Sequence, residues 1–370
     1  MQRKTNSTPP NKASRRAMIF EGIRTFSAAV GTTAVIMLTL TGILDMVLPQ
    51  DESAVQAAST LSEVDNAVQQ VQLGGELFGI RLFSDGIIVA ALSDIYTESG
   101  ACCPAKEAGI KTGDYVLSAN GQTVTSNAAL SAALSEGEPV SLTLRRNEET
   151  FDTTVTPVRS GNTFLTGMWV RDSAAGLGTV TYYTADGTAF GALGHGICDA
   201  DTKSLLPLRE GEPAAITVCG IERGHAGTPG RLRGYFSGGK KPGTLTANTP
   251  LGIFGVTAKP RENDLIEILP RDEVKIGKVQ IVTTIDDQGA RLFDAELERV
   301  SQNAEQETKT LVLHITDPEL LERTGGIVQG MSGSPIIQDG KLAGVVTHVF
   351  IDDPTRGYGI FIESMLEAAE

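Results

Sequence analysis

The chain has 370 residues and a mass of 39.0 kDa, which is more than one hydrophobic core usually organises, so a single small module is excluded. Hydrophobic residues make up 41% and charged residues 21%, and this composition excludes a chain that is disordered throughout or crosses a membrane many times. The net charge of -14 argues against nucleic acid as a partner, because contact with phosphates requires a basic surface.

The N-terminal 48 residues differ in charge from the rest. They carry six basic and two acidic residues, a net charge of +4, which leaves -18 for the remainder. Residues 25–44 contain no charge and are long enough to cross a bilayer as one helix. The basic residues before them are expected to stay in the cytoplasm. The sequence therefore predicts a cytoplasmic segment over 1–24, a transmembrane signal anchor over 25–44 and an extracytoplasmic remainder.

A cleaved secretory signal is the closest alternative to this anchor, although its apolar region is usually shorter. The sequence does not decide whether the chain is cleaved later near Ala54–Ala58. Residues 45–69 are polar and rich in Ala, Ser and Gln, which is typical of a tether.

A compact module is expected over residues 70–158. It contains short strand patterns, a turn at Asn120–Gly121 and a helix pattern over Ser126–Leu134 behind a Ser/Asn cap. Its stretch PAKEAGIKTGDYVLSANGQTV, residues 104–124, resembles the core of bacterial PDZ domains. The resemblance implies a peptide-binding domain.

In such a domain an extended peptide adds as a strand beside the main helix. The resemblance implies that Phe78, Gly79 and Ile80 form the loop whose amides receive a peptide carboxylate. Glu76 departs from this pattern, because an acid nearby repels a carboxylate. The alternative is that Gly79 only permits a bulge.

From residue 160 to residue 370, short β-type runs are separated by glycines, at about the 8–12-residue spacing that predicts a β-sandwich or barrel. The stretch 227–252 holds basic residues among glycines, but no helix follows it as a phosphate-binding loop requires. A surface loop or hairpin is expected there. The predicted fold class is mainly β with some α.

The sequence GMSGSP, residues 330–335, precedes two runs that predict a hairpin. Small residues on both sides of Ser332 let its hydroxyl project from a tight turn. The amides of Gly330 and Ser332 can then converge on a developing oxyanion. A GxSGxP sequence before a strand pair resembles the nucleophile loop of chymotrypsin-like serine peptidases. A purely structural turn is the alternative.

A serine nucleophile requires a proton acceptor, and the chain has four histidines. His195, in GALGH, has the small-residue setting of a catalytic histidine at a strand end. His348 is a rival because it follows Ser332 closely in sequence. His225 is expected in a glycine-rich loop, and His314 in an apolar strand.

A third group should orient the imidazole. Asp317 lies 15 residues before Ser332, at the end of an apolar run. Asp317 also fits the N-cap of a helix that begins with proline. The sequence therefore does not decide between a helix-capping role and a place in the triad. Asp264, Asp286 and Asp287 are the alternatives.

No metal or cofactor is expected. A cluster of His195, Cys198, Asp199 and Asp201 lacks a further group at ligand spacing. The four cysteines include the adjacent pair Cys102 and Cys103, which cannot bond without strain, and all four are expected to be buried small hydrophobes.

The order of anchor, PDZ-like unit, GALGH, TGGIVQGMSGSPI and AGVVTHVFIDDPTRGYGIFIE is similar to the stage IV sporulation protein B family of endospore-forming bacteria. The resemblance implies a chymotrypsin-like β-barrel serine peptidase over 160–370, with a triad of His195, Asp317 and Ser332. It also implies an exported signalling endopeptidase on the forespore side, in the space between two membranes. There it cuts itself and a membrane-bound regulator, which releases intramembrane processing of a sigma factor.

The partners expected are therefore this membrane-anchored substrate, the chain itself, a peptide ligand of the PDZ-like domain, and the membrane through residues 25–44. A non-catalytic, membrane-tethered peptide sensor is the alternative function. A broad quality-control protease is a third.

Overall fold

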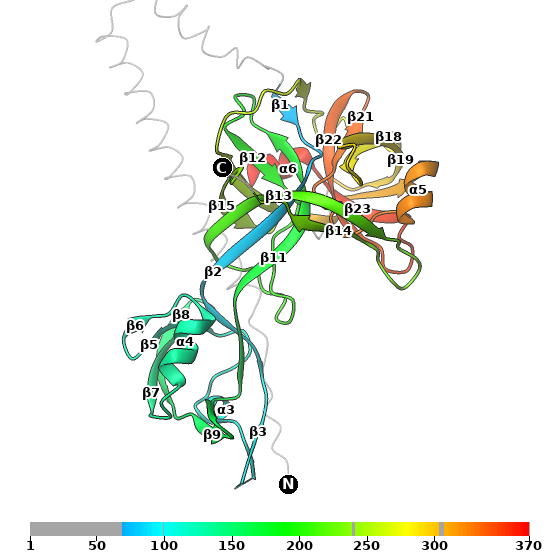
Figure 1. Cartoon of the computed structure of the whole chain (residues 1–370). Helices are drawn as coiled ribbons and strands as arrows, with labels where there is room; N and C mark the ends of the chain where they lie inside the picture. The colour runs from blue at the N-terminus through cyan, green and yellow to red at the C-terminus, as the bar shows by residue number, and fades with distance from the viewer. Residues whose placement is uncertain (1–68, 99, 239–240, 303–306, 370) are drawn as a thin grey trace, which may run out of the picture. The chain divides into compact units, whose positions relative to one another are not determined.

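The computed structural model describes residues 69–98, 100–238, 241–302 and 307–369, which belong to one compact unit (Figure 1). The predicted cytoplasmic segment and anchor, residues 1–44, lie outside the described residues, as does the predicted tether except for Gln69. Within the described ranges, no helix is long and apolar enough to cross a membrane. Most of the elements are strands, so the prediction of a mainly β fold is confirmed.

Two antiparallel strands of 16 residues each, β2 (Leu77–Leu92) and β11 (Met168–Tyr183), run side by side along the unit (Figure 1). They pair from Leu77↔Thr179 to Leu92↔Met168. The later part of β2 also pairs with β5 (Tyr115–Ala119), and its earlier part pairs with β13 (Leu208–Glu222). One strand therefore contributes to the sheet of the PDZ-like module and to the sheet of the C-terminal module.

The PDZ-like module is built around helix α4 (Asn127–Leu134), whose Leu130 packs in a core with Val116 and Leu142. The helix begins where predicted, because the Ser126 hydroxyl accepts the Ala129 amide. Asn120 and Gly121 have φ of +50° and +74°, as the predicted hairpin turn requires. The other elements are β1 (Gln70–Leu73), which pairs outside the module, and β3 (Ile95–Thr97), β4 (Gly100–Cys102), α3 (Pro104–Glu107), β6 (Gln122–Thr123), β7 (Val140–Arg146), β8 (Glu149–Val155), β9 (Val158–Ser160) and β10 (Thr163–Leu165).

The C-terminal module contains a closed six-stranded barrel, which confirms the predicted barrel. Its apolar side chains alternate inward; Ile281, Leu297, Leu313 and Ile336 have no exposed surface. The strands follow the order β18 (Gly277–Thr284), β19 (Ala290–Val300), β20 (Leu311–Ile315), β23 (Arg356–Phe361), β22 (Lys341–Val349) and β21 (Pro335–Gln338). Three helices accompany it: η1 (Glu307–Lys309), α5 (Pro318–Thr324) and α6 (Ile362–Glu367).

A second sheet of this module has the strand order β15–β16–β12–β11–β2, with β13 on the far side of β2. The stretch 227–252, predicted as a surface loop or hairpin, forms β14 and then enters the β15–β16 hairpin. The strands not yet bounded are β12 (Ala189–Ala192), β14 (Arg231–Phe236), β15 (Gly243–Thr249), β16 (Gly252–Thr257) and β17 (Leu265–Glu267).

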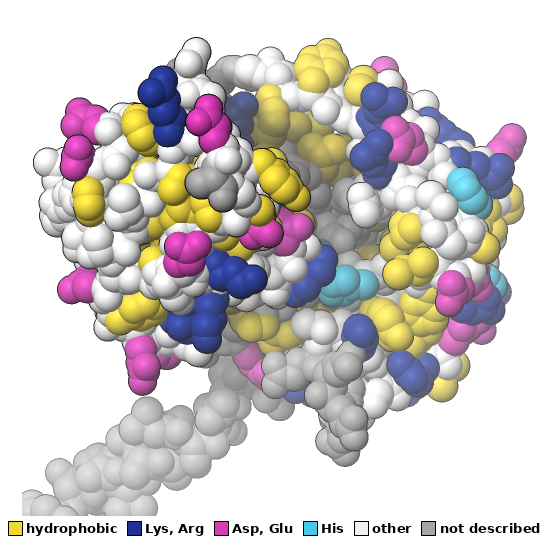
Figure 2. All heavy atoms as spheres, turned by 90° about the horizontal axis from the view of Figure 1, so that it is seen from below, with side chains coloured by type: hydrophobic (Ala, Val, Ile, Leu, Met, Phe, Trp, Pro, Cys, Tyr) yellow, Lys and Arg dark blue, Asp and Glu magenta, His cyan; other side chains and the backbone are white. Residues whose placement is uncertain are grey.

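The cysteines differ from their prediction. Cys103 is buried and Cys102 is partly buried, but Cys198 and Cys219 are exposed. On the face shown in Figure 2, acidic and basic side chains are interspersed, and the surface is hollowed near its centre.

Candidate active site

Strand β11 holds the turn that carries Ser332. The Thr179 amide donates to the Ser332 carbonyl at 2.9 Å, and its hydroxyl donates to the Gly330 carbonyl at 2.8 Å. The Thr181 hydroxyl donates to the Gly333 carbonyl, also at 2.8 Å. Both threonines are fully buried. The turn is therefore attached to the sheet through three of its own carbonyl groups, a support that local sequence patterns did not reveal.

The Ser332 hydroxyl donates to the carbonyl of Thr347 at 2.7 Å. Among the described residues, no acceptor lies in place for the amides of Gly330 and Ser332. Gly330 has φ of +105°, a conformation that side chains other than hydrogen disfavour. Two unpaired amides in the turn that carries a serine hydroxyl are the groups that an oxyanion hole requires.

The backbone before His195 is strained. Leu193 and Gly194 have φ of +71° and +67°, and a positive φ at leucine is rare. The His195 Nδ1 lies 2.9 Å from the carbonyl of Gly196. Because a carbonyl only accepts, Nδ1 carries the proton and Nε2 is left as the proton acceptor. Burial lowers the pKa of His195, and the bond to Gly196 opposes this shift.

His195 and Ser332 line the same cavity of about 580 Å³, together with Gly330. The structure thus brings together the predicted base, the predicted nucleophile and a predicted oxyanion group from segments far apart in sequence. The described residues show no hydrogen bond between His195 and Ser332. The Ser332 hydroxyl must therefore turn away from the Thr347 carbonyl before the imidazole can take its proton, as is common in enzymes without substrate.

The rival base His348 stacks on His195, with ring centroids 4.7 Å apart and planes 34° apart. It does not line the cavity. Burial, followed by the charges of His195 and Lys309, lowers the pKa of His348. Burial, which lowers the pKa of His195, favours the neutral form that a base requires.

The other two histidines lie elsewhere. His314, on β20, is 3.5 Å from Glu298, and His225 forms an isolated bridge with Thr228. Asp199 and Asp201 bind Arg171. Within the part of the chain that the structure describes, no three His, Cys, Asp or Glu side chains are grouped as a metal site would need.

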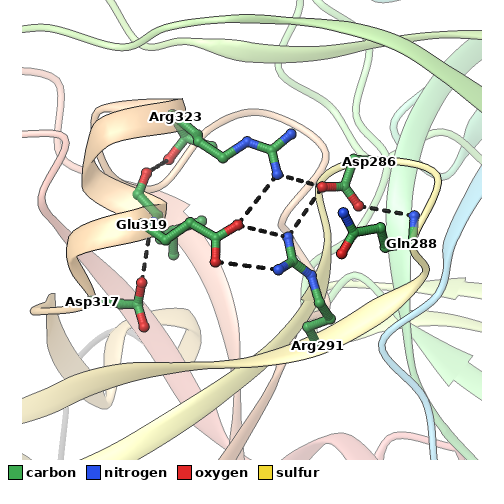
Figure 3. Close-up of polar contacts among 8 residues, drawn as sticks. Asp286, Gln288, Arg291, Asp317, Glu319 and Arg323 are labelled. Atoms are coloured by element: carbon green, nitrogen blue, oxygen red, sulfur yellow. Dashed lines mark hydrogen bonds and ion pairs between the residues drawn. The ribbon is translucent and has the colours of Figure 1, made fainter.

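Asp317 has the contacts of the helix cap that the sequence left open. Its carboxylate accepts the Leu320 amide of α5 at 3.0 Å and the Asp294 amide of β19 at 3.3 Å. Figure 3 shows it at the start of α5, beside the ion pairs of Glu319 and Arg323. It does not line the cavity of His195 and Ser332. The hydrogen bond that orients His195 in this structure comes from Gly196.

The alternative aspartates do not replace it. Asp286 binds Arg291 at 3.1 Å and Arg323 (Figure 3). Neither it nor Asp264 nor Asp287 lines the cavity.

Asp317→Ala is expected to lower the free energy of unfolding by about 1 kcal/mol, because α5 loses its cap. Denaturant unfolding measures the change. Asp317→Asn is the matched control, since asparagine caps about as well as aspartate, and its stability should stay close to that of the parent. A fall in turnover by several powers of ten in this Asn variant would reveal an orienting contact to His195 beyond the cap. An Ala variant as stable as the parent would contradict the cap.

A second groove lies beside α4. Its volume is about 630 Å³, and its lining includes Leu130 and Leu134 of α4 and Trp169 of β11. Trp169 is 64% exposed although its indole donates to Ser93 at 2.9 Å. This large exposed ring on a groove wall is a candidate peptide-binding feature.

The predicted carboxylate loop is not part of this groove. Phe78, Gly79 and Ile80 lie inside β2, paired with β11 on one edge and β13 on the other. Their backbone groups are engaged in the sheet, so the prediction that they receive a peptide carboxylate is wrong. The prediction failed because the sequence of a glycine-containing strand cannot be distinguished from that of a PDZ-type ligand loop.

Comparison with known proteins gives two family matches. Residues 162–366 match the family described as SpoIVB peptidase S55, and residues 95–146 match the PDZ domain family. The chain is also 41% identical, over 54 residues, to serine protease HTRA1 of Xenopus laevis. That similarity covers 15% of this chain and 12% of the relative.

Proposed function

Because the chain belongs to the SpoIVB peptidase S55 family, we propose that it is a serine peptidase of sporulation, with Ser332 as its nucleophile and His195 as its general base. The observation that carries this proposal is the single cavity lined by His195, Ser332 and Gly330, with two amides free to bind an oxyanion. The family match adds the reaction class, which is hydrolysis of a peptide bond.

The proposed reaction is acyl transfer. The Ser332 hydroxyl turns from the Thr347 carbonyl to Nε2 of His195, loses its proton and attacks the scissile carbonyl. The amides of Gly330 and Ser332 donate to the oxyanion. His195 then gives the proton to the leaving amine, while the Gly196 carbonyl holds its Nδ1–H. Water releases the acyl group by the same steps in reverse. In the family triad Asp317 would take the orienting role, and the Asn variant above tests this.

The proposed substrates are the chain itself and the extracytoplasmic part of a membrane-bound regulator. Support comes from the resemblance of the sequence to the sporulation family and from the apolar segment 25–44, which would tether the enzyme near such a substrate. The proposed location is the space between the forespore and mother-cell membranes, with the tether either kept or cleaved.

The PDZ domain is proposed to bind an extended peptide in the groove between α4 and Trp169. The apolar side chains of Leu130 and Leu134 and the exposed indole of Trp169, which line this groove, suit an apolar anchor residue of such a peptide.

A fluorophosphonate probe tests the catalytic proposal. The probe should label the wild-type protein, and labelling should be lost in Ser332→Ala and strongly slowed in His195→Ala. The reactive form has a neutral imidazole. Because burial lowers the pKa of His195, labelling should persist as the pH falls through about 6.5 and fail only at more acidic pH.

The control is the same labelling after heat denaturation, which should abolish it. Absence of labelling in the folded wild-type protein would favour the alternative, a peptide sensor in which the Ser332 turn has only a structural role. Labelling of a serine other than Ser332 would contradict the assigned nucleophile.

A further inference from the structure

One edge of β11 is open where the strand approaches the catalytic cavity. β2 pairs with β11 from Met168 to Thr179, whereas β12 covers the opposite edge only from Val180 onwards. Among the described residues, no strand pairs with that opposite edge before Val180. Ala175 and Gly176 are exposed, and a Cβ added at Gly176 would meet open space.

The direction of the backbone groups along this edge follows from the hydrogen bonds at its end. The Val180 amide donates to the Glu76 carbonyl and the Val180 carbonyl accepts the Gly75 amide, so both groups face the segment just before β2. The amide and carbonyl of Thr179 face the other way and bind Ser332 and Leu193. The register with β2 is continuous from Thr179 back to Ser173.

Backbone groups alternate in direction along a strand, with a period of two residues. The amides and carbonyls of Leu177 and Ala175 therefore point to the same open edge as those of Thr179. The described residues provide no partner for them. Ala175, Gly176 and Leu177 also line the cavity that holds His195 and Ser332.

We propose that an extended segment of the protein substrate adds to this edge as a further strand and binds through its main chain to Ala175 and Leu177. This inference rests on the proposed peptidase activity of Ser332. Strand addition suits a peptide, because the edge offers amides and carbonyls at the spacing of an extended chain. The next outward amide on this edge, that of Thr179, donates to the Ser332 carbonyl. A chain bound along the edge therefore lies next to the proposed nucleophile.

The same strand also passes the second groove. Trp169, on the groove wall, lies eight residues before Leu177, a distance of roughly 26 Å along an extended strand. A substrate bound to β11 can therefore be long enough to reach both the catalytic cavity and the PDZ domain.

The test removes one outward amide. Proline is tolerated in a strand where its missing amide faces away from the sheet, so Ala175→Pro should fold. Its kcat/KM for unfolded casein and for the full-length Ser332→Ala chain should fall at least about tenfold, the usual effect of losing a hydrogen bond to the substrate. Ala175→Ser keeps the amide at the same position and is the matched comparison, so its kcat/KM should be about tenfold above that of Ala175→Pro.

Fluorophosphonate labelling separates this inference from the proposed function. The small probe needs no strand pairing, so all three proteins should be labelled at similar rates. Unlabelled wild-type protein overturns the peptidase proposal itself. Equal cleavage by the Pro and Ser variants, both labelled, overturns only the β11 inference. Labelled wild-type protein that cuts neither substrate also overturns it, because an open edge leading to a reactive serine should accept unfolded chains.

A second measurement does not depend on the folding of the Pro variant. Peptides that span an observed cleavage site are methylated at one backbone nitrogen at a time. Cleavage should fall at every second position on the side of the bond that lies along β11. Equal sensitivity at successive positions overturns the inference.

Discussion

Ser332→Ala is expected to reduce turnover by roughly five to six powers of ten, because no other hydroxyl in the cavity can form the acyl intermediate. Self-cleavage and cleavage of any added protein should disappear together. The variant loses one hydrogen bond, from the hydroxyl to the Thr347 carbonyl, so its stability should change by only about 1 kcal/mol. Mass spectrometry of the incubated chain and denaturant unfolding measure the two effects.

Ser334→Ala is the matched control for this loss. Ser334 lies two residues further along the same turn, fully buried, and its hydroxyl has no hydrogen-bond partner among the described residues. Removal of an unpaired buried hydroxyl should leave turnover and stability near the parent values. Processing that continues unchanged in Ser332→Ala, or stops equally in Ser334→Ala, would refute the assignment of the nucleophile.

Gly333→Ala is expected to have the largest effect on stability. Gly333 has φ of +97°, and a Cβ there would lie far inside contact distance of the Thr179 carbonyl and the Leu193 amide. Both atoms belong to backbone that cannot move independently. The clash should lower the free energy of unfolding by about 3–5 kcal/mol. It should also disturb catalysis, since Thr179 holds the Ser332 turn and Leu193 precedes His195.

Gly340→Ala separates the clash from the backbone conformation. Gly340 has φ of +79° in the turn between β21 and β22, and a Cβ there would meet nothing within 4 Å. This variant should lose only about 1 kcal/mol, from the unfavourable φ alone. Thermal unfolding of both variants checks the difference, and equal losses would show that the Gly333 site can relax.

Local sequence patterns predicted several elements of the fold. The cap at Ser126 and the turn at Asn120–Gly121 depend on residues near one another in the chain, so their physics is visible in the sequence. The same holds for the glycines around Ser332, whose positive φ needs no distant partner.

Three features of the structure were not apparent from sequence patterns. Phe78 to Ile80 were predicted to be a ligand loop, whereas they pair with β11 and β13. The residues of a strand do not reveal which strands it pairs with. The orienting group of His195 was expected to be a side chain, whereas the structure supplies the Gly196 carbonyl. The stacking of His348 on His195 joins strand β22 to the bend after β12, two segments that lie far apart in the sequence.

By itself, the sequence indicated the reaction class and the two residues proposed to be reactive. A nucleophile turn and the segment around a catalytic histidine need small residues at neighbouring positions, because the backbone there is tight. Such short-range needs are visible as motifs in the sequence. Only the tertiary structure decided where Asp317 binds, which edge of β11 is open and how Thr179 holds the Ser332 turn. Those properties depend on which backbone groups are already paired, and pairing is decided by the packing of the whole sheet.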